Sequence, residues 1–345
     1  MRVLFIVPYP TEGPSNRFRV EQYFPELEKE GILYKLRPFY SQDMYRIVHK
    51  KGHYFKKILY LAYFTILRFA DVLSAGSFDV IFIHREAFPV AGAFFETLFR
   101  LFSKRMIYDF DDSIFLKKPA KVNKTIAFSD YVIAGNNFLK NYAAQHNKNV
   151  TVIPTCIDTG KYAPKNSASE KDNIIIGWIG TSFTSIYLDM LKDVFRQLSG
   201  SYKNIEFRIV GGKLDIAGVP LSCKYWALDS EVNDLQEFDI GIMPLFDDEW
   251  SRGKCAFKII QYMAVGVPAV ASRVGMNSEV IEDGRDGFLV SGKNEWVEKL
   301  SLLIGNKNLR RDMGIRAREK ALRAYSILAN KQKFLGVLKD AAAKK

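Results

Sequence analysis

Short apolar runs alternate along this chain with segments in which apolar residues recur every three or four positions. The runs have the length of strands, and the periodic segments have the pattern of amphipathic helices. We expect strands in residues 2–10, 78–84, 105–110 and 130–135, and again in residues 173–180, 205–212, 238–245 and 268–272. Because these runs are apolar throughout, they favour parallel sheets that helices cover on both faces.

A polar stretch interrupts this alternation near the middle of the chain. Pro, Ser, Asn and Lys accumulate in residues 150–173, which predicts a linker between two β/α series. The pattern predicts an α/β protein of two doubly wound, Rossmann-like domains facing a central cleft, over residues 1–160 and 161–325. Residues 326–345 are expected to form a helix that packs back on the first domain. Ligands of such sheets bind at the carboxyl ends of the strands.

The composition narrows the class of protein. The chain has 345 residues, 48% of them hydrophobic and 26% charged, as in ordinary globular proteins. Its three cysteines lie far apart, so they predict neither a disulfide framework nor a metal site, and a reducing cytoplasm fits best. The formal net charge of +12 fits nucleic acid, an anionic membrane or phosphorylated small molecules. No nucleic-acid-binding motif accompanies the charge, so we do not expect nucleic acid as a partner.

Basic and aromatic residues cluster in residues 45–69. Five basic residues there precede an aromatic-rich apolar segment: His49, Lys50, Lys51, Lys56 and Lys57. Such a segment can anchor a helix among lipid headgroups, or it can be a core-packing helix with a solvated basic start. Its apolar run, residues 58–69, is shorter than the roughly 20 residues that span a bilayer. The opening MRVLFIVPYP lacks a signal-peptide pattern, so we expect no membrane-spanning segment.

Polar residues follow several of the predicted strands. Arg17 and Arg19 come after the first strand, where a loop or helix start can bind anions. His84 ends the strand of residues 78–84, and it is either a catalytic histidine or a structural one. The pair Asp111–Asp112 can bind a metal, act as a base or cap the next helix. Since no nearby His or third carboxylate completes a metal set, we expect no metal ion.

The segment GKCAFKIIQYMAVGVPAVAS, residues 253–272, predicts a mostly buried helix running into a strand. At 100° per residue, Lys254, Lys258 and Gln261 share one narrow stripe of that helix, and apolar residues cover nearly all the rest. The lysines are either snorkelling at a domain rim or binding a diphosphate beside the helix N-terminus. The chain has no G-x-G-x-x-G, P-loop or G-x-S-x-G motif, which argues against NAD, simple NTPase and hydrolase functions.

Residues 238–290 resemble the nucleotide-sugar-binding half of retaining GT-B glycosyltransferases of family 4, the glycosyl transferases group 1. The stretch that carries this resemblance is FDIGIMPLFDDEWSRGKCAFKIIQYMAVGVPAVASRVGMNSEVIEDGRDGFLV. The similarity extends to VTVIPTCIDTGKYAP and to SDYVIAGNNFLKNYA before it. It implies an acceptor-binding first domain, a donor-binding second domain, a UDP- or GDP-linked sugar as substrate, and no cofactor.

The family's site residues carry over to this chain with departures. Gln261 stands at the second of the two family glutamates, which contacts the ribose, and Gly253 replaces the first, so Asp248 or Glu249 would have to face the sugar. Lys254 and Lys258 would replace the family's basic diphosphate pair. The resemblance thus implies catalytic residues His84 and Lys258, and acceptor-binding residues Arg17, Arg19 and Arg85. The implied donor-binding residues are Gly180, Thr181, Arg252, Lys254, Lys258, Gln261 and Glu279.

The sequence therefore predicts a hexosyltransferase that acts on a saccharide or lipid-linked acceptor in cell-surface polysaccharide synthesis. We expect it in the cytoplasm, or peripherally on the inner face of the plasma membrane. Because both family glutamates are replaced, a non-catalytic GT-B scaffold or binding protein remains an alternative. A GT-B nucleotide-sugar epimerase or phosphorylase is the other alternative.

Overall fold

The computed structural model describes residues 1–48, 50–90, 92–164 and 173–343. His49 and part of the predicted linker therefore lie outside the described residues. The chain divides into two compact units, one of Met1–Thr155 with Asn330–Lys345 and one of Cys156–Ala329. These divisions fall close to the boundaries expected at residues 160 and 325.

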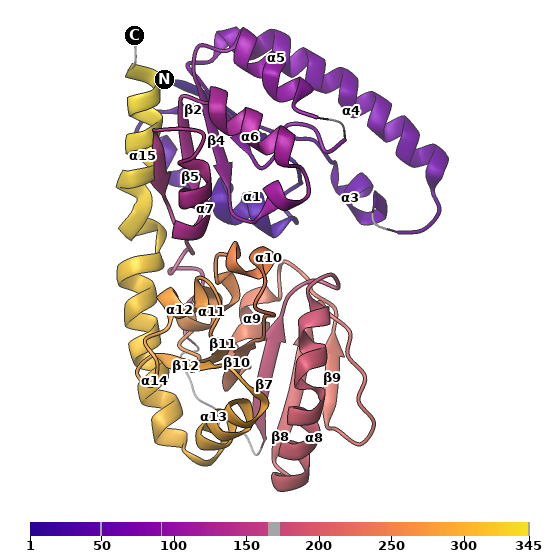
Figure 1. Cartoon of the computed structure of the whole chain (residues 1–345), viewed down its shortest axis with the longest axis vertical. Coiled ribbons are helices and arrows are strands. Elements are labelled where there is room, and N and C mark those ends of the chain that lie inside the picture. Colours follow the sequence, from indigo (N-terminus) through magenta and orange to yellow (C-terminus); the bar gives the residue numbers. More distant parts are fainter. Residues whose placement is uncertain (49, 91, 165–172, 344–345) are drawn as a thin grey trace. The chain divides into compact units, whose positions relative to one another are not determined.

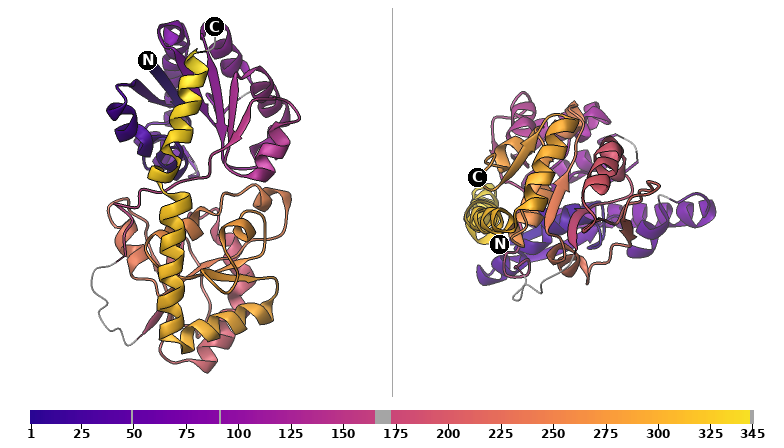
Figure 2. Two further views of the ribbon diagram at one scale, coloured as in Figure 1. Left: turned by 90° about the vertical axis from the view of Figure 1, so that its left-hand side faces the viewer. Right: turned by 90° about the horizontal axis from the view of Figure 1, so that it is seen from below.

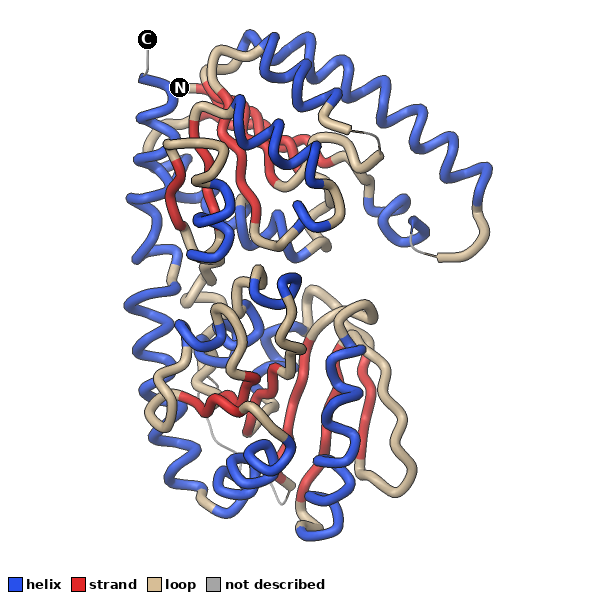
Figure 3. Tube along the Cα trace, viewed as in Figure 1, coloured by secondary structure: helices blue, strands red, loops and turns tan. Residues whose placement is uncertain are grey.

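The first unit contains a six-stranded parallel sheet with the order β2-β1-β3-β4-β5-β6 (Figures 1 and 3). Strands β1, β3 and β4 are fully or almost fully buried, as expected for a sheet covered on both faces. The strands are β1 (Arg2–Val7), β2 (Leu33–Pro38), β3 (Val80–His84), β4 (Met106–Phe110), β5 (Tyr131–Ala134) and β6 (Val150–Val152).

Helices cover both faces of this first sheet. Helix α15 lies on one face, and α4, α5 and α6 lie on the other (Figures 1 and 2). The α-helices that belong wholly to this unit are α1 (Pro14–Arg19), α2 (Phe24–Lys29), α3 (Gln42–Val48), α4 (Tyr54–Ser74), α5 (Phe94–Phe102), α6 (Pro119–Phe128) and α7 (Asn137–Ala143). Short 3₁₀ turns, among them η1 (Glu21–Tyr23) and η3 (Ile114–Leu116), connect them.

Helix α15 (Ile327–Ala343) completes the core of the first unit from far along the chain. The ring of Phe334 stacks on Tyr23, with centroids 4.1 Å apart, and lies 5.7 Å from the ring of Phe82 in β3. Lys331 Nζ also donates to Glu26 of α2 at 2.7 Å. The residues from Asn330 onward therefore belong to the first unit by packing.

The second unit contains another six-stranded parallel sheet, with the order β12-β11-β10-β7-β8-β9. Its strands are β7 (Ile174–Ile179), β8 (Ile205–Val210), β9 (Leu221–Lys224), β10 (Ile240–Met243), β11 (Ala269–Ser272) and β12 (Gly287–Val290). Its α-helices are α8 (Lys192–Ser201), α9 (Glu231–Gln236), α10 (Glu249–Arg252), α11 (Phe257–Ala264), α12 (Asn277–Val280), α13 (Lys293–Gly305) and α14 (Lys307–Lys320). Large apolar side chains such as Trp178, Phe195 and Trp296 fill its core.

The predicted fold class, two doubly wound Rossmann-like domains, is confirmed. Each of the eight predicted runs contains a strand, but β2, β6, β9 and β12 were not predicted. Strand β6 lies at the start of the predicted linker and pairs in parallel with β5, so the linker assignment is wrong for residues 150–152. This strand is only half-buried and three residues long, so its apolar signal is weak.

The apolar run of residues 58–69 lies within a longer helix than predicted. Helix α4 has 21 residues, because it continues beyond this run at both ends. It includes the apolar residues Tyr54 and Phe55 before the run and Val72 and Leu73 after it. Together with the next turn, residues 54–77 are long and apolar enough to cross a membrane by length and composition. The expectation that this segment is too short to span a bilayer is therefore wrong. Length and composition do not distinguish a spanning helix from a helix that packs on the protein, so the contacts of α4 have to be considered.

Gly314 of α14 gives a test of packing in the second unit. A Cβ atom at this position would lie 2.1 Å from the carbonyl oxygen of Gly266, a backbone atom that has little room to move. We expect Gly314→Ala to lower the free energy of unfolding by about 1–3 kcal/mol. Gly336→Ala in α15 is the control, because its Cβ would meet nothing within 4 Å and should stabilise the helix by about 0.5–1 kcal/mol. Equal effects in denaturant titrations would contradict the close approach.

Candidate functional site

The strand order of the first unit identifies the end of its sheet where a ligand-binding site is expected. The chain leaves β1 towards β2 on one side and later adds β3 on the other, so β1 and β3 flank the point where the strand order reverses. Doubly wound sheets bind ligands at this point, beyond the carboxyl ends of the strands. Helix α1 follows β1 there, and His84 ends β3.

His84 and Asp109 meet because their strands are in register. The two residues are Cα partners in β3 and β4, so their side chains lie on the same face of the sheet. His84 Nδ1 lies 2.7 Å from Asp109 Oδ2. Because a carboxylate only accepts hydrogen bonds, the proton of this bond is on Nδ1. Both side chains are buried from solvent.

Helix α1 adds two side chains to this pair. Ser15 and Arg19 are four residues apart, so they share one face of the helix. Ser15 Oγ lies 2.7 Å from His84 Nε2. The Arg19 guanidinium binds both carboxylate oxygens of Asp109 and donates to the carbonyl of Ile153 at 2.7 Å. The result is a chain of polar groups from buried Arg19 through Asp109 and His84 to half-buried Ser15.

The charges around Asp109 fix its ionisation. Burial by itself would raise its pKa, but the charge of Arg19 and the hydrogen bond from His84 outweigh burial and lower the pKa below its usual value. Asp109 is therefore an anion at neutral pH, and it holds the orientation of the His84 ring.

A second group of charges surrounds Ser15. Arg85 Nη1 lies 3.3 Å from Ser15 Oγ, 3.5 Å from Asp111 and 3.0 Å from Asp112. Ser15 Oγ is also 3.0 Å from an oxygen of Asp111. Burial would lower the pKa of Arg85, but Asp112 and Asp111 raise it overall, so Arg85 remains charged. The carboxylates of the Asp111–Asp112 pair thus contact Arg85 and Ser15.

Arg85 adopts a backbone conformation that residues other than glycine rarely adopt. Its φ is 60°, in the left-handed region. Three contacts hold Arg85 in this conformation. Its N–H donates to the Asp109 carbonyl at 2.7 Å, its carbonyl accepts from the Tyr108 hydroxyl at 2.8 Å, and its guanidinium binds the two aspartates. Backbone strain of this kind is common at functional sites, which makes Arg85 a candidate site residue.

The predicted residues of the first unit have different surroundings. His84 and Arg85 lie in this polar cluster. Arg19 was predicted to bind an acceptor, but its side chain is buried in the pair with Asp109, so it supports the cluster from inside. Arg17 is also largely buried, with its guanidinium 4.5 Å from the centre of the Phe18 ring. Sequence reasoning missed Ser15 and Asp109, although an aspartate inside the apolar run MIYDF is a signal.

The second sheet reverses its order between β7 and β10, and α11 lies against β10. Tyr262 of α11 fixes the helix there: its hydroxyl donates to the Ile242 carbonyl at 3.1 Å and accepts from the Ile179 N–H at 3.3 Å. A Cβ on Gly241 would lie 2.4 Å from the Tyr262 ring, so glycine leaves room for it. Helix α11 is therefore anchored to the carboxyl ends of both strands.

Lys258, in the first turn of α11, lies beside the end of β7. Its Nζ is 5.4 Å from the centre of the Trp178 ring, a cation–π distance. The helix begins after Ala256, whose φ of 50° is left-handed and ends the preceding turn abruptly. The Lys258 amine and the positive end of the α11 helix dipole thus come together at this sheet's switch point.

Lys254 does not share the helix with Lys258. Helix α11 begins at Phe257, so Lys254 lies in the turn between α10 and α11, and the predicted continuous stripe is wrong at this position. Its Nζ is 5.5 Å from the Trp250 ring and 5.8 Å from the Tyr187 ring. The left-handed turn at Ala256 separates the two lysines.

Gln261 is buried, and its amide is engaged within the second unit. Its Nε2 donates to Glu231 Oε1 at 2.9 Å, and the same carboxylate accepts from Tyr162 and from the Trp226 indole. Glu231 is itself buried, so it requires these donors. One N–H of this amide is thus bonded to Glu231, a partner that the sequence did not reveal.

The remaining predicted donor-binding residues lie on loops and helix ends of the second unit. The N–H of Gly180 donates to the Val210 carbonyl at 3.0 Å. Arg252, exposed at the end of α10, pairs with Asp247 at 2.8 Å. Asp248, a candidate for the missing sugar contact, caps α10 by accepting from the Ser251 N–H. Exposed positions are occupied by Thr181, Glu249 and Glu279.

Among the described residues, 1–48, 50–90, 92–164 and 173–343, no three His, Cys, Asp or Glu side chains are placed to hold a metal ion.

Comparison with known protein families finds a match in the second unit. Residues 173–306 match the family model of the glycosyl transferases group 1. An uncharacterised glycosyltransferase of Methanocaldococcus jannaschii is 24% identical over 231 residues, 60% of this chain and 60% of that protein. The D-inositol 3-phosphate glycosyltransferase of Paenarthrobacter aurescens is 38% identical over 78 residues, 22% of this chain and 18% of that protein. These alignments thus span less than two thirds of the relatives' length.

Solved structures with the same fold cover almost the whole chain. Anabaena HepE in complex with UDP and glucose has a TM-score of 0.70 at 14% identity, covering 98% of this chain and 99% of HepE. Sucrose-phosphate synthase from Thermosynechococcus elongatus has a TM-score of 0.74 at 13% identity, covering 99% of both chains. The fold is that of GT-B glycosyltransferases. Residues 173–306, which make up less than half of the chain, are similar to the glycosyl transferases group 1.

Proposed function

We propose that this protein is a retaining, family 4 hexosyltransferase that moves a sugar from a UDP- or GDP-linked donor to a saccharide or lipid-linked acceptor in cell-surface polysaccharide synthesis. The observation that carries the proposal is the position of Lys258 in the first turn of α11, at the switch point of the second sheet. The family match of residues 173–306 supports it, and so does the UDP bound by the structurally similar HepE.

The proposed donor site lies in the second unit. When the sugar leaves its nucleoside diphosphate, negative charge develops on the diphosphate oxygens. Lys258 and the N–H groups at the start of α11 would stabilise that charge without reorganising. Gln261, with its amide N–H on Glu231, would offer its carbonyl oxygen to a ribose hydroxyl.

The proposed acceptor site lies in the first unit. Arg85 and Ser15 are half-buried polar groups of its cluster, and they would bind the acceptor hydroxyls. His84 would orient Ser15 from the buried side. The acceptor oxygen would attack the sugar from the face that the diphosphate leaves, and the leaving phosphate would take the acceptor proton. This scheme uses no cofactor and no metal ion.

Lys258→Ala tests the donor site. We expect it to weaken binding of a nucleoside diphosphate by about 1.5–3 kcal/mol, the range for a hydrogen bond to a charged group. The free nucleoside lacks phosphate and should bind both proteins alike. Titration calorimetry with UDP, GDP and the two nucleosides measures both effects.

Lys299→Ala is a matched control for this experiment. Lys299 also lies over an aromatic ring, with its Nζ 5.5 Å from the centre of Phe288, but it belongs to α13. We expect its diphosphate affinity to equal that of the unaltered protein. If Lys258→Ala also binds with unchanged affinity, the donor site is misplaced. If the protein binds a nucleotide sugar but neither hydrolyses nor transfers it, the chain is a binding protein.

A further inference from the structure

Helix α4 presents an apolar face to solvent. Every residue of this helix is described, and eleven of them are exposed. Ten of the eleven are apolar or aromatic, and Lys56 is the exception: Tyr54, Phe55, Ile58, Leu59, Ala62, Tyr63, Ile66, Phe69, Ala70 and Leu73. Phe55 is 77% exposed, Ile66 68% and Leu73 73%, so the face is apolar along the whole helix. Surface helices of globular proteins normally expose their polar face.

Two of the four charged residues of α4, Arg68 and Asp71, lie on its inner side. Arg68 and Asp71 are buried and 3.3 Å apart, and Asp71 also accepts from Arg37 of β2 at 2.6 Å. The C-terminal half of the helix thus has its charged groups inside and apolar groups outside. This packing also opposes insertion across a bilayer, because a spanning helix would have to break the contacts of Arg68 and Asp71.

Helix α5 extends the apolar face. Phe94 is 54% exposed and Leu101 73% exposed, and the ring of Phe94 lies 6.2 Å from that of Phe69 on α4. We call the exposed apolar residues of these two helices the α4–α5 surface. An exposed apolar surface of this extent marks a contact with a membrane or another protein.

Positive charge accompanies one end of the α4–α5 surface. Lys50, Lys51 and Lys56 are exposed around the start of α4, and no Asp or Glu occurs in the sequence between Asp43 and Asp71. Cations next to exposed Tyr and Phe side chains favour binding at the interface of an anionic membrane. The complement of this surface is therefore both apolar and anionic.

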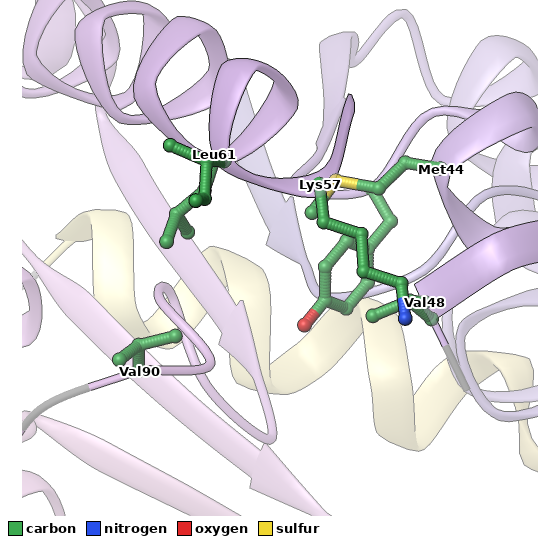
Figure 4. A pocket seen from close by; sticks show the side chains of 7 residues that line it. Met44, Val48, Lys57, Leu61 and Val90 are labelled. Atoms are coloured by element: carbon green, nitrogen blue, oxygen red, sulfur yellow. The ribbon is translucent and has the colours of Figure 1, made fainter. Parts of the chain in front are cut away.

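A pocket lies beside the lysine-rich end. It has a volume of about 190 Å³ and is lined mainly by apolar side chains of α3, α4 and the nearby loops: Tyr40, Met44, Val48, Lys57, Ile58, Leu61 and Val90. Leu61 and Val90 line one side, and Met44, Val48 and Lys57 lie on the other (Figure 4). Ile58 belongs to both the pocket and the exposed face, so the pocket adjoins the α4–α5 surface and suits a hydrocarbon chain.

We propose that the α4–α5 surface docks on an anionic membrane, with α4 lying along the bilayer interface and the lysines among the headgroups. Its apolar side chains enter the boundary between headgroups and acyl chains. Figure 1 shows α4 extending past the sheet of its own unit, which leaves the face accessible along its length. The inference goes beyond the proposed function and does not rest on it.

Flotation with lipid vesicles tests the proposal on the full chain. The unaltered protein should float with vesicles of phosphatidylcholine and phosphatidylglycerol at low salt, and less at high salt because the attraction is screened. Ile66→Glu should reduce the bound fraction by at least tenfold, since it places a charge in the apolar face. The variant Lys50→Glu with Lys51→Glu should reduce partitioning to anionic vesicles by about thirtyfold or more.

Ile315→Glu is the matched control, because Ile315 is 53% exposed on α14 of the second unit and should not affect flotation. Circular dichroism and calorimetry with UDP verify folding and donor binding separately from lipid binding. Equal flotation with pure phosphatidylcholine, or equal flotation of Ile66→Glu and Ile315→Glu, would overturn the proposal. A dimer in light scattering that Ile66→Glu dissociates would also overturn it, because the surface would then join two copies of this chain.

Discussion

Asp109→Asn should lower the free energy of unfolding of the first unit by about 3–5 kcal/mol, the range for breaking a buried ion pair by removing one partner. The variant keeps the size of the side chain but leaves the buried Arg19 guanidinium without its counter-charge. The carboxylate of Asp109 accepts a hydrogen bond from His84 Nδ1, whereas the amide of asparagine also carries N–H donors. Denaturant titration followed by near-ultraviolet circular dichroism measures the loss.

The pH dependence of stability gives the same pair a second test. The folded pKa of Asp109 is lower than that of an unfolded aspartate, which is about 3.9. Its contribution is therefore complete above pH 4 and disappears as the pH falls through the folded pKa. Asp109→Asn should lack this acid-induced loss. Asp43→Asn, at an exposed and distant ion pair, should behave like the unaltered protein, and an equal loss in both would contradict the assignment.

His84→Ala should lower turnover by about 100-fold, the scale for losing one positioned polar group of a catalytic site. The imidazole links Asp109 to the half-buried Ser15 hydroxyl, so its removal frees Ser15 to turn away from the proposed acceptor. Binding of UDP or GDP should change little, because the proposed donor groups belong to the second unit. Steady-state kinetics and calorimetry on the same preparation separate these effects.

Two further variants show whether His84 acts through Ser15. Ser15→Ala should also lower turnover. It should reduce stability less than His84→Ala does, because it removes only one half-buried hydroxyl. His146→Ala changes an exposed histidine of the same unit, and turnover should not respond to it. If His84→Ala lowers stability but keeps full turnover, His84 is a structural histidine.

Much of the fold was readable from the sequence because buried parallel strands are continuous apolar runs. Strands β3, β4 and β7 have that form, and all three were predicted. Strand β2 was missed because it lies at a sheet edge and carries Lys35 and Arg37, so its apolar signal is diluted. An edge strand is covered less than a central one and tolerates charge.

The candidate site was only partly readable, because its decisive contacts join residues far apart in the sequence. Position at a strand end was enough to select His84 and Arg85. The partner of Arg19, in contrast, is Asp109, 90 residues away, and the partner of Gln261 is Glu231, 30 residues away. Helical spacing predicted that Lys254 and Lys258 share a face, but the left-handed turn at Ala256 interrupts that helix. Such turns depend on tertiary packing, which periodicity does not report.

The discontinuity of the first unit has a consequence for how the protein is made. Phe334 stacks on Tyr23 and lies against Phe82, so residues of α15 belong to a core whose other members are translated much earlier. A ribosome has to synthesise the whole second unit before that core is complete. During translation, the aromatic surface that receives Phe334 is left uncovered while the second unit, continuous in sequence, is free to fold first. The first unit therefore completes its core only after the second unit has been synthesised.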